Sequence, residues 1–204
     1  VAQPLERGSN NYYSIIQGRV KMEKRHNYAA AGFLLLGIGA AGRAFLGVPE
    51  GVTMAELSLT VLLVIGALLL TRQGLAALVC GLAATALELV LCGSWVQAGA
   101  ALAAAAPFFR LADLWLLLGL VWGSLPAARR AVDDLKYTRS TRMMLVACGV
   151  LLAAHTVLRI ASLAAPASVP LGKASSGSFV VFSVLLLWYT VLMVKAYNVQ
   201  RTKH

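Results

Sequence analysis

The chain has 204 residues, of which 59% are hydrophobic and 13% charged, and its formal net charge is +10. This composition excludes an ordinary soluble domain, in which about a quarter of the residues are charged. The basic excess does not indicate nucleic-acid binding, because these residues fall mainly between apolar runs. The positive-inside bias and anionic lipid headgroups account for them there. We therefore expect the lipid bilayer, and no nucleic acid, as a partner.

Six apolar runs follow one another along the chain and are separated by short polar breaks. They cover residues 28–48, 53–70, 74–92, 108–125, 143–163 and 178–196. Each is close to the roughly 20 residues that a helix needs to cross a hydrocarbon core of about 30 Å. A helix also satisfies its own backbone hydrogen bonds in lipid. The pattern predicts an all-α polytopic membrane protein, a bundle of six transmembrane helices, in the cell membrane of a bacterium.

The same pattern divides the chain into three parts. A polar segment covers residues 1–27, the transmembrane domain covers residues 28–197, and a short tail covers residues 198–204. The first segment lacks the apolar core of a signal peptide. Met22 opens a short basic stretch directly before the first apolar run. Two interpretations stay open: translation begins at Met22, or the residues before it form a disordered cytoplasmic tail.

The basic residues fall on alternate breaks. If the amino terminus is cytoplasmic and six spans follow, 14 of the 18 Lys and Arg residues lie on the cytoplasmic side. The opposite orientation would translocate all 14, against the positive-inside bias. We therefore expect both termini in the cytoplasm. The loop of residues 126–142 would then contact anionic headgroups or dock a cytoplasmic or membrane partner subunit. Its basic residues are Arg129, Arg130, Lys136, Arg139 and Arg142.

The segment before the fourth run is the least regular part of the pattern. Residues 93–107 are rich in small side chains and end at Pro107. We interpret them as an outer connection, either a loop or a half-buried re-entrant helix, with the span beginning near Phe108. Beyond this span, Arg129 and Asp133 are spaced i, i+4, as are Arg130 and Asp134. This spacing predicts a short helical extension of the fourth span.

Ionisable side chains within the spans converge on one depth in the outer half of the predicted bundle. Such groups are costly in a membrane and normally face a bundle interior or a water-filled cavity. They could line a polar chamber that binds a small polar or charged solute. Alternatively, they could form an ion-pair network that joins the helices, because three acids stand against three arginines. The candidate ligand-binding residues are Glu88, Arg43, Arg159, His155, Glu56, Arg110 and Asp113.

Motifs for catalysis, metal binding or nucleotide hydrolysis do not appear in the sequence. It contains no H-E-x-x-H, no G-x-S-x-G and no P-loop pattern. The three cysteines are odd in number and show no C-x-x-C spacing, so neither a disulfide framework nor a zinc site is expected. His155 is interpreted as a packed core histidine. We expect no cofactor, no metal and no catalytic residue.

Three functions follow from these features, in order of preference. The first is binding or transport of a small solute through an outward-facing polar chamber. The second is a non-catalytic accessory or structural membrane subunit. The third is an intramembrane enzyme acting on lipid, which no sequence motif supports. Charges clustered around an open cavity would favour the first function, whereas closed and mutually paired charges would favour the second.

Overall fold

The computed structural model describes residues 27–47, 52–70, 75–92, 100–132 and 135–202. Within these ranges the chain is all-α and contains six helices, five of them long and apolar enough to cross a membrane. The architecture is consistent with a multi-pass membrane protein. The helices are the first helix (Asn27–Leu46), α2 (Met54–Leu69), α3 (Leu75–Cys92), α5 (Ala100–Val132), α6 (Leu135–Ala164) and α7 (Val169–Thr202).

Several predictions fall on residues outside the described ranges. They concern the start at Met22, the polar segment as far as residue 26, residues 93–99, and the acids Asp133 and Asp134. The side chain of Lys136 also lies outside the described part of the chain.

Helix α2 is shorter than the span predicted for residues 53–70. Its 16 residues correspond to about 24 Å at about 1.5 Å per residue, against a hydrocarbon core of about 30 Å. Its start is fixed by a capping box. The Thr53 hydroxyl accepts a hydrogen bond from the Glu56 amide at 3.2 Å, and the Glu56 carboxylate accepts one from the Thr53 amide at 2.9 Å.

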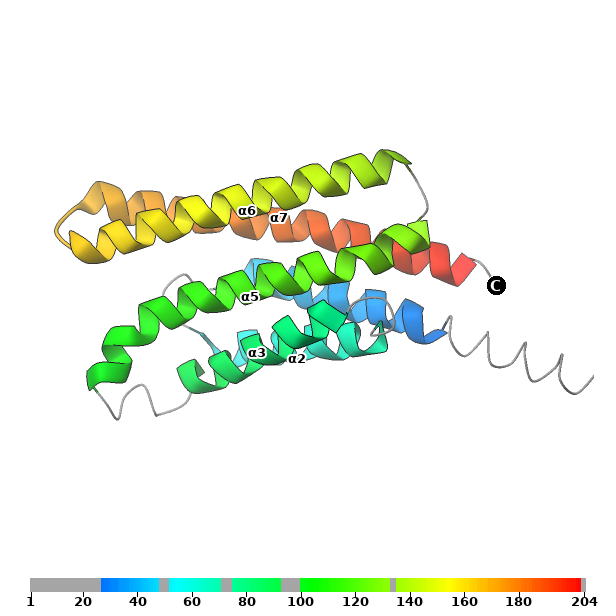
Figure 1. Cartoon of the computed structure of the whole chain (residues 1–204), viewed down its shortest axis with the longest axis horizontal. Coiled ribbons are helices and arrows are strands. Elements are labelled where there is room, and N and C mark those ends of the chain that lie inside the picture. The colour runs from blue at the N-terminus through cyan, green and yellow to red at the C-terminus, as the bar shows by residue number, and fades with distance from the viewer. Residues whose placement is uncertain (1–26, 48–51, 71–74, 93–99, 133–134, 203–204) are drawn as a thin grey trace, which may run out of the picture.

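Helix α5 corrects the interpretation of the segment before the fourth span. Residues 100–107 are neither a loop nor a separate re-entrant helix, because α5 begins at Ala100 and continues through Pro107 and Pro126 to Val132. Alanine is the strongest helix former, and packed membrane helices tolerate an internal proline. Its first turns lie at an angle to the rest of the helix (Figure 1). The predicted extension beyond residue 125 is present as far as Val132.

Helices α6 and α7 also extend beyond their apolar runs. They contain 30 and 34 residues, whereas the predicted spans cover residues 143–163 and 178–196. Hydropathy marks only the apolar part of a helix, and the polar turns at its ends continue the same backbone structure. Pro170 stands in the first turn of α7, where a proline removes no intrahelical hydrogen bond.

The helices lie side by side along the long axis of the molecule. The pair α6 and α7 lies on one side, α2 and α3 lie on the other, and α5 contacts α3, α6 and α7 (Figure 1). The start of the first helix and the end of α7 lie at the same end of the bundle. This placement is the one expected if both termini lie on one side of a membrane.

The first helix approaches α2 very closely at glycine. A Cβ atom added to Gly32 would lie 3.0 Å from the carbonyl oxygen of Gly66, and one added to Gly66 would lie 2.9 Å from that of Gly32. Small residues allow such close backbone contacts between membrane helices. The other side of the first helix faces α7, since a Cβ atom on Gly37 would lie 3.5 Å from the Met193 side chain.

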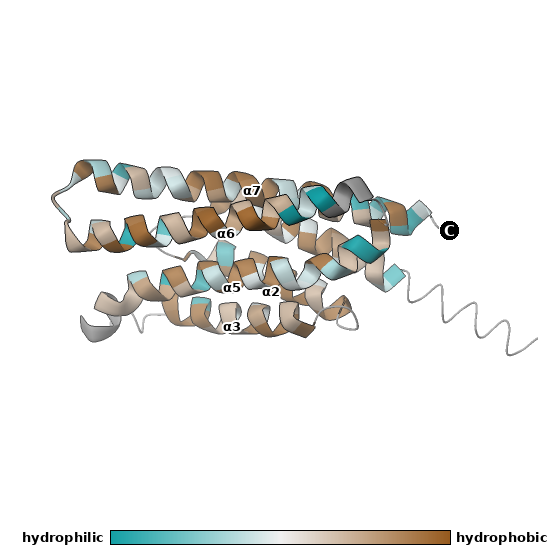
Figure 2. Ribbon diagram, turned by 45° about the horizontal axis from the view of Figure 1, so that its top comes forward, coloured by the Kyte–Doolittle hydropathy of each residue, from teal (hydrophilic) through white to brown (hydrophobic). Residues whose placement is uncertain are grey.

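The surface is apolar along the helices and basic at one end. Large apolar side chains such as Val79, Leu82 and Val146 are exposed, as lipid-facing residues of a membrane bundle would be. Hydrophilic residues gather at the end of the bundle that carries the carboxyl terminus (Figure 2). The exposed arginines of the predicted basic loop are Arg129, Arg130, Arg139 and Arg142.

Candidate functional site

Five charged side chains from four helices meet at one buried position, which we call the charge network. Each is at most 3% exposed to solvent. They are five of the seven candidate residues that the sequence places at one depth. The network consists of Arg43 from the first helix, Glu56 from α2, Glu88 from α3, and Arg110 and Asp113 from α5.

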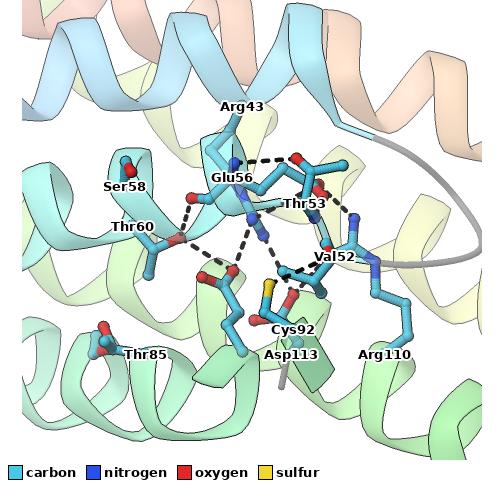
Figure 3. Close-up of polar contacts among 12 residues, drawn as sticks. Arg43, Val52, Thr53, Glu56, Ser58, Thr60, Thr85, Cys92, Arg110 and Asp113 are labelled. Carbon is cyan, nitrogen blue, oxygen red and sulfur yellow. Dashed lines mark hydrogen bonds and ion pairs between the residues drawn. The ribbon is translucent and has the colours of Figure 1, made fainter. Parts of the chain in front are cut away.

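Arg43 joins the first helix to the three others. Its Nη1 atom lies 2.6 Å from Glu88 Oε1 and 3.6 Å from Glu56 Oε1. Its Nη2 atom donates a hydrogen bond of 3.1 Å to Asp113 Oδ2. Figure 3 shows this side chain reaching from its helix towards Glu56 and Asp113. A planar guanidinium can bind several carboxylates at once because its donors point in different directions.

Arg110 binds two of the same carboxylates from the other side. Its Nη2 atom donates a hydrogen bond of 2.7 Å to Glu56 Oε1, and its Nη1 atom donates one of 2.7 Å to Asp113 Oδ2. Arg110 and Asp113 are three residues apart on α5, so they share a helix face. Glu56 and Asp113 each contact both arginines, which closes the network.

Sequence reasoning missed Thr60, because it considered only ionisable side chains. The Thr60 hydroxyl lies 3.0 Å from Glu88 Oε1 and 3.2 Å from the Glu56 carbonyl oxygen, and it can donate to either. The signal was available, since Thr60 stands one helical turn after Glu56 and therefore on the same face of α2. Thr60 is fully buried and links α2 to Glu88 on α3.

The charges within the network do not balance. Three carboxylates face two guanidinium groups, whereas the sequence places three arginines at this depth. The third arginine, Arg159, lies half-buried on α6 and has an interaction of its own. Two buried carboxylate oxygens, Glu88 Oε2 and Asp113 Oδ1, have no hydrogen-bond partner among the residues that the structure describes.

His155 belongs to a neighbouring packing site between α6 and α7. Its Nδ1 atom lies 2.9 Å from Ser178 Oγ and 3.1 Å from the Ser175 carbonyl oxygen. Its ring lies against Phe179, with 5.8 Å between the ring centroids. Phe179 also lines the cavity beside the network. These contacts are those of a packed core histidine.

The cavity beside the network is too small for an organic solute. Its volume is about 10 Å³, and Arg43, Glu56, Arg110 and Phe179 contribute to its lining. A cavity of this size holds about one water molecule. The conformation described here therefore contains a closed ion-pair network and no solute chamber at this position.

The part of the chain that the structure describes contains no candidate metal site and three free thiols. Within it, no group of three or more His, Cys, Asp and Glu side chains could hold a metal ion. Cys80, Cys92 and Cys148 are free thiols, and Cys92 donates a hydrogen bond to the Val52 carbonyl oxygen at 3.2 Å.

Comparison with protein-family models, with curated proteins and with solved structures finds no match to this chain. Its class therefore follows from its own features. An all-α chain in which five of the described helices are long and apolar enough to span a membrane is consistent with a multi-pass membrane protein.

Proposed function

We propose that the protein is a non-catalytic accessory subunit of the bacterial plasma membrane, with both termini in the cytoplasm, whose charge network fixes the packing of four helices. One observation carries this proposal. The five buried charges pair with one another around a cavity of about 10 Å³. The second of the three functions expected from the sequence is thus better supported than the first.

A structural role accounts for the position of the charges. Apolar packing gives helices in lipid little drive to associate, so polar contacts between them contribute to assembly. A buried ion network can also fix helix register, because any other arrangement leaves a charge unpaired. Here Arg43 and Arg110 connect the first helix, α2, α3 and α5 in one arrangement.

In such a subunit, the basic end of the bundle would contact lipid headgroups or a partner subunit outside the bilayer core. Four exposed arginines stand near the end of α5 and the start of α6. In the proposed orientation this end faces the cytoplasm, where anionic headgroups attract clustered basic residues. An acidic surface of a partner subunit would be recognised by the same charges.

Small-solute binding or transport is the second candidate, and the unbalanced carboxylate favours it. One excess negative charge among buried residues would suit a cationic or zwitterionic solute. The network would have to open first, because the present cavity has the volume of about one water molecule. An intramembrane enzyme gains no support from the described residues.

A thermal-shift screen separates these two functions. The purified protein is heated with cationic, zwitterionic and anionic solutes, in parallel with a Glu88→Gln variant. We expect that no solute raises the melting temperature of either protein. A solute that stabilises the wild type, but not a folded Glu88→Gln variant, would reject the accessory role and establish a binding site.

A further inference from the structure

The excess carboxylate of the charge network has a chemical consequence of its own. With all five groups ionised, three carboxylates and two guanidinium groups leave one uncompensated negative charge among fully buried atoms. An uncompensated charge in a low-dielectric interior is removed by protonation wherever a proton can bind. We propose that the network holds one exchangeable proton, shared between the carboxyl groups of Glu88 and Asp113.

The geometry around Arg43 identifies this pair. Glu88 and Asp113 bind the two terminal nitrogens of the same guanidinium group, at 2.6 Å and 3.1 Å. Both carboxyl groups are fully buried. Burial disfavours the ionised form of both groups, and two carboxylates bound to one guanidinium group also repel each other, so this site favours one retained proton.

The unpartnered oxygens point to the same pair. Glu88 Oε2 and Asp113 Oδ1 are buried and accept no hydrogen bond. A proton on either carboxyl group would add a donor next to these oxygens. Among the described residues, Arg43 Nη1 is also buried without a hydrogen-bond partner, although it lies 2.6 Å from Glu88 Oε1. Glu56 differs, because Oε1 accepts from Arg110 and Oε2 accepts from the Thr53 amide. Both oxygens of Glu56 therefore have hydrogen-bond donors while the group is ionised, and Glu56 needs no proton.

The surrounding helices do not supply another positive charge to these oxygens in the described geometry. Arg43 and Arg110 already bind the carboxylates, and neutral side chains of α7 line the adjacent cavity. His155 on α6 is directed to Ser175 and Ser178. Among the other titratable groups of these helices, Cys92 on α3 donates its hydrogen bond to the Val52 carbonyl oxygen, and Arg159 on α6 has an interaction of its own.

Proton binding makes the stability of the bundle depend on pH. The folded protein keeps this proton at neutral pH, whereas an exposed carboxyl group in the unfolded chain releases it above about pH 4. The folded state then binds more protons than the unfolded state, so stability falls as the pH rises. Loss of the proton leaves two like charges between α3 and α5 and weakens that contact.

Infrared spectroscopy of the purified protein at pH 7 tests this proposal. A protonated carboxyl group absorbs at a higher frequency than a carboxylate, and the chain has only eight Asp and Glu residues. We expect one carboxyl band in the wild type, shifted in D2O, that disappears in both Glu88→Gln and Asp113→Asn. Each of these variants has two carboxylates for two arginines and needs no proton.

The matched control is Asp133→Asn, which removes a carboxylate from the predicted cytoplasmic loop and should leave the band unchanged. The absence of the band from the wild type would overturn the proposal, as would its persistence in folded Glu88→Gln. If Asp113→Asn does not fold, comparison of the carboxyl band in Glu88→Gln and in the wild type still tests the proposal. Alkaline titration of the wild type should abolish the band and lower the melting temperature together, and a band without this coupling would also contradict the proposal.

Discussion

Arg43 is the residue on which the charge network depends most. It contacts all three carboxylates, and its side chain is 2% exposed. Removal of Arg43 should lower the free energy of unfolding more than removal of a carboxylate, because the network already has one acid in excess. Glu88→Gln therefore balances the charges of the network and leaves no arginine without a carboxylate.

Arg43→Gln is expected to lower the free energy of unfolding by about 3–5 kcal/mol, because it leaves three buried carboxylates with one guanidinium group. Glu88→Gln alone should be far less destabilising. The double variant should recover part of the loss, since it removes one of the stranded carboxylates. Chemical denaturation of the purified proteins measures all three. Equal losses in the two single variants would contradict this account of the charges.

Tyr189 and Ser124 offer a second comparison at the scale of single residues. Their hydroxyl oxygens lie 2.6 Å apart, and Ser124 also donates to the Val121 carbonyl oxygen at 2.8 Å. Tyr189→Phe leaves Ser124 bonded to the backbone and should cost about 1 kcal/mol. Ser124→Ala leaves the fully buried Tyr189 hydroxyl without this partner and should cost more, about 1–3 kcal/mol. The reverse order in denaturation experiments would show that Tyr189 has another partner.

At the scale of elements, two kinds of contact hold the first helix in place. Glycines allow its backbone to approach α2, and Arg43 ties it to the three helices of the network. Close packing fixes the distance between the helices and the ion pairs fix their register. Helix α5 has a comparable role in the other half of the bundle, where it contacts α6 and α7.

Gly39→Ala is expected to destabilise the bundle by about 1–3 kcal/mol, because overpacking forces neighbouring atoms apart. The new Cβ atom would lie 2.7 Å from Leu63 Cγ and 3.0 Å from the Leu59 carbonyl oxygen. Leu63 is fully buried, and side chains in a close-packed interior have little room to move.

The matched control for this change is Gly149→Ala in α6, where a Cβ atom would meet nothing within 4 Å. Alanine is favoured over glycine in a helix by about 0.5–1 kcal/mol, so this variant should be slightly more stable than the wild type. Melting temperatures in detergent check both changes. Equal behaviour of the two variants would show that the first helix does not pack against α2 as described.

At the scale of the whole molecule, the orientation in the membrane is a prediction from charge. Hydrophilic residues gather at the end of the bundle that carries the carboxyl terminus (Figure 2). The first helix begins at that end, and Arg43 of the charge network lies near the opposite end of this helix. The start of α7 and the start of α6 lie at opposite ends of the bundle. Exposed residues at these two ends therefore report on the two sides of a membrane.

Lys173→Cys and Arg139→Cys test this orientation, because both positions are exposed. A membrane-impermeant thiol reagent applied to intact cells should label the cysteine at Lys173 and not the one at Arg139. The wild type, whose thiols are buried or half-buried, controls for background labelling. Labelling at Arg139 in sealed cells would reverse the proposed orientation.

The sequence by itself determined the all-α class, the order of the helices and the position along its helix of each charged residue that meets in the network. These are local properties, because an apolar run of about 20 residues reports a helix and the position of a residue along it reports its depth. Helix ends were less well determined. The polar turns of α6 and α7 lie outside the apolar runs, and the start of α5 was obscured by Pro107.

Only the tertiary structure decided which charges meet and what space remains between them. Depth along a helix does not specify the direction in which a side chain points or which helices are neighbours. Arg159 shares its predicted depth with Arg43, yet α6 holds it half-buried while Arg43 and Arg110 bind three acids. The resulting imbalance and the cavity of about 10 Å³ depend on how four helices pack. No pattern within a single helix contains that information.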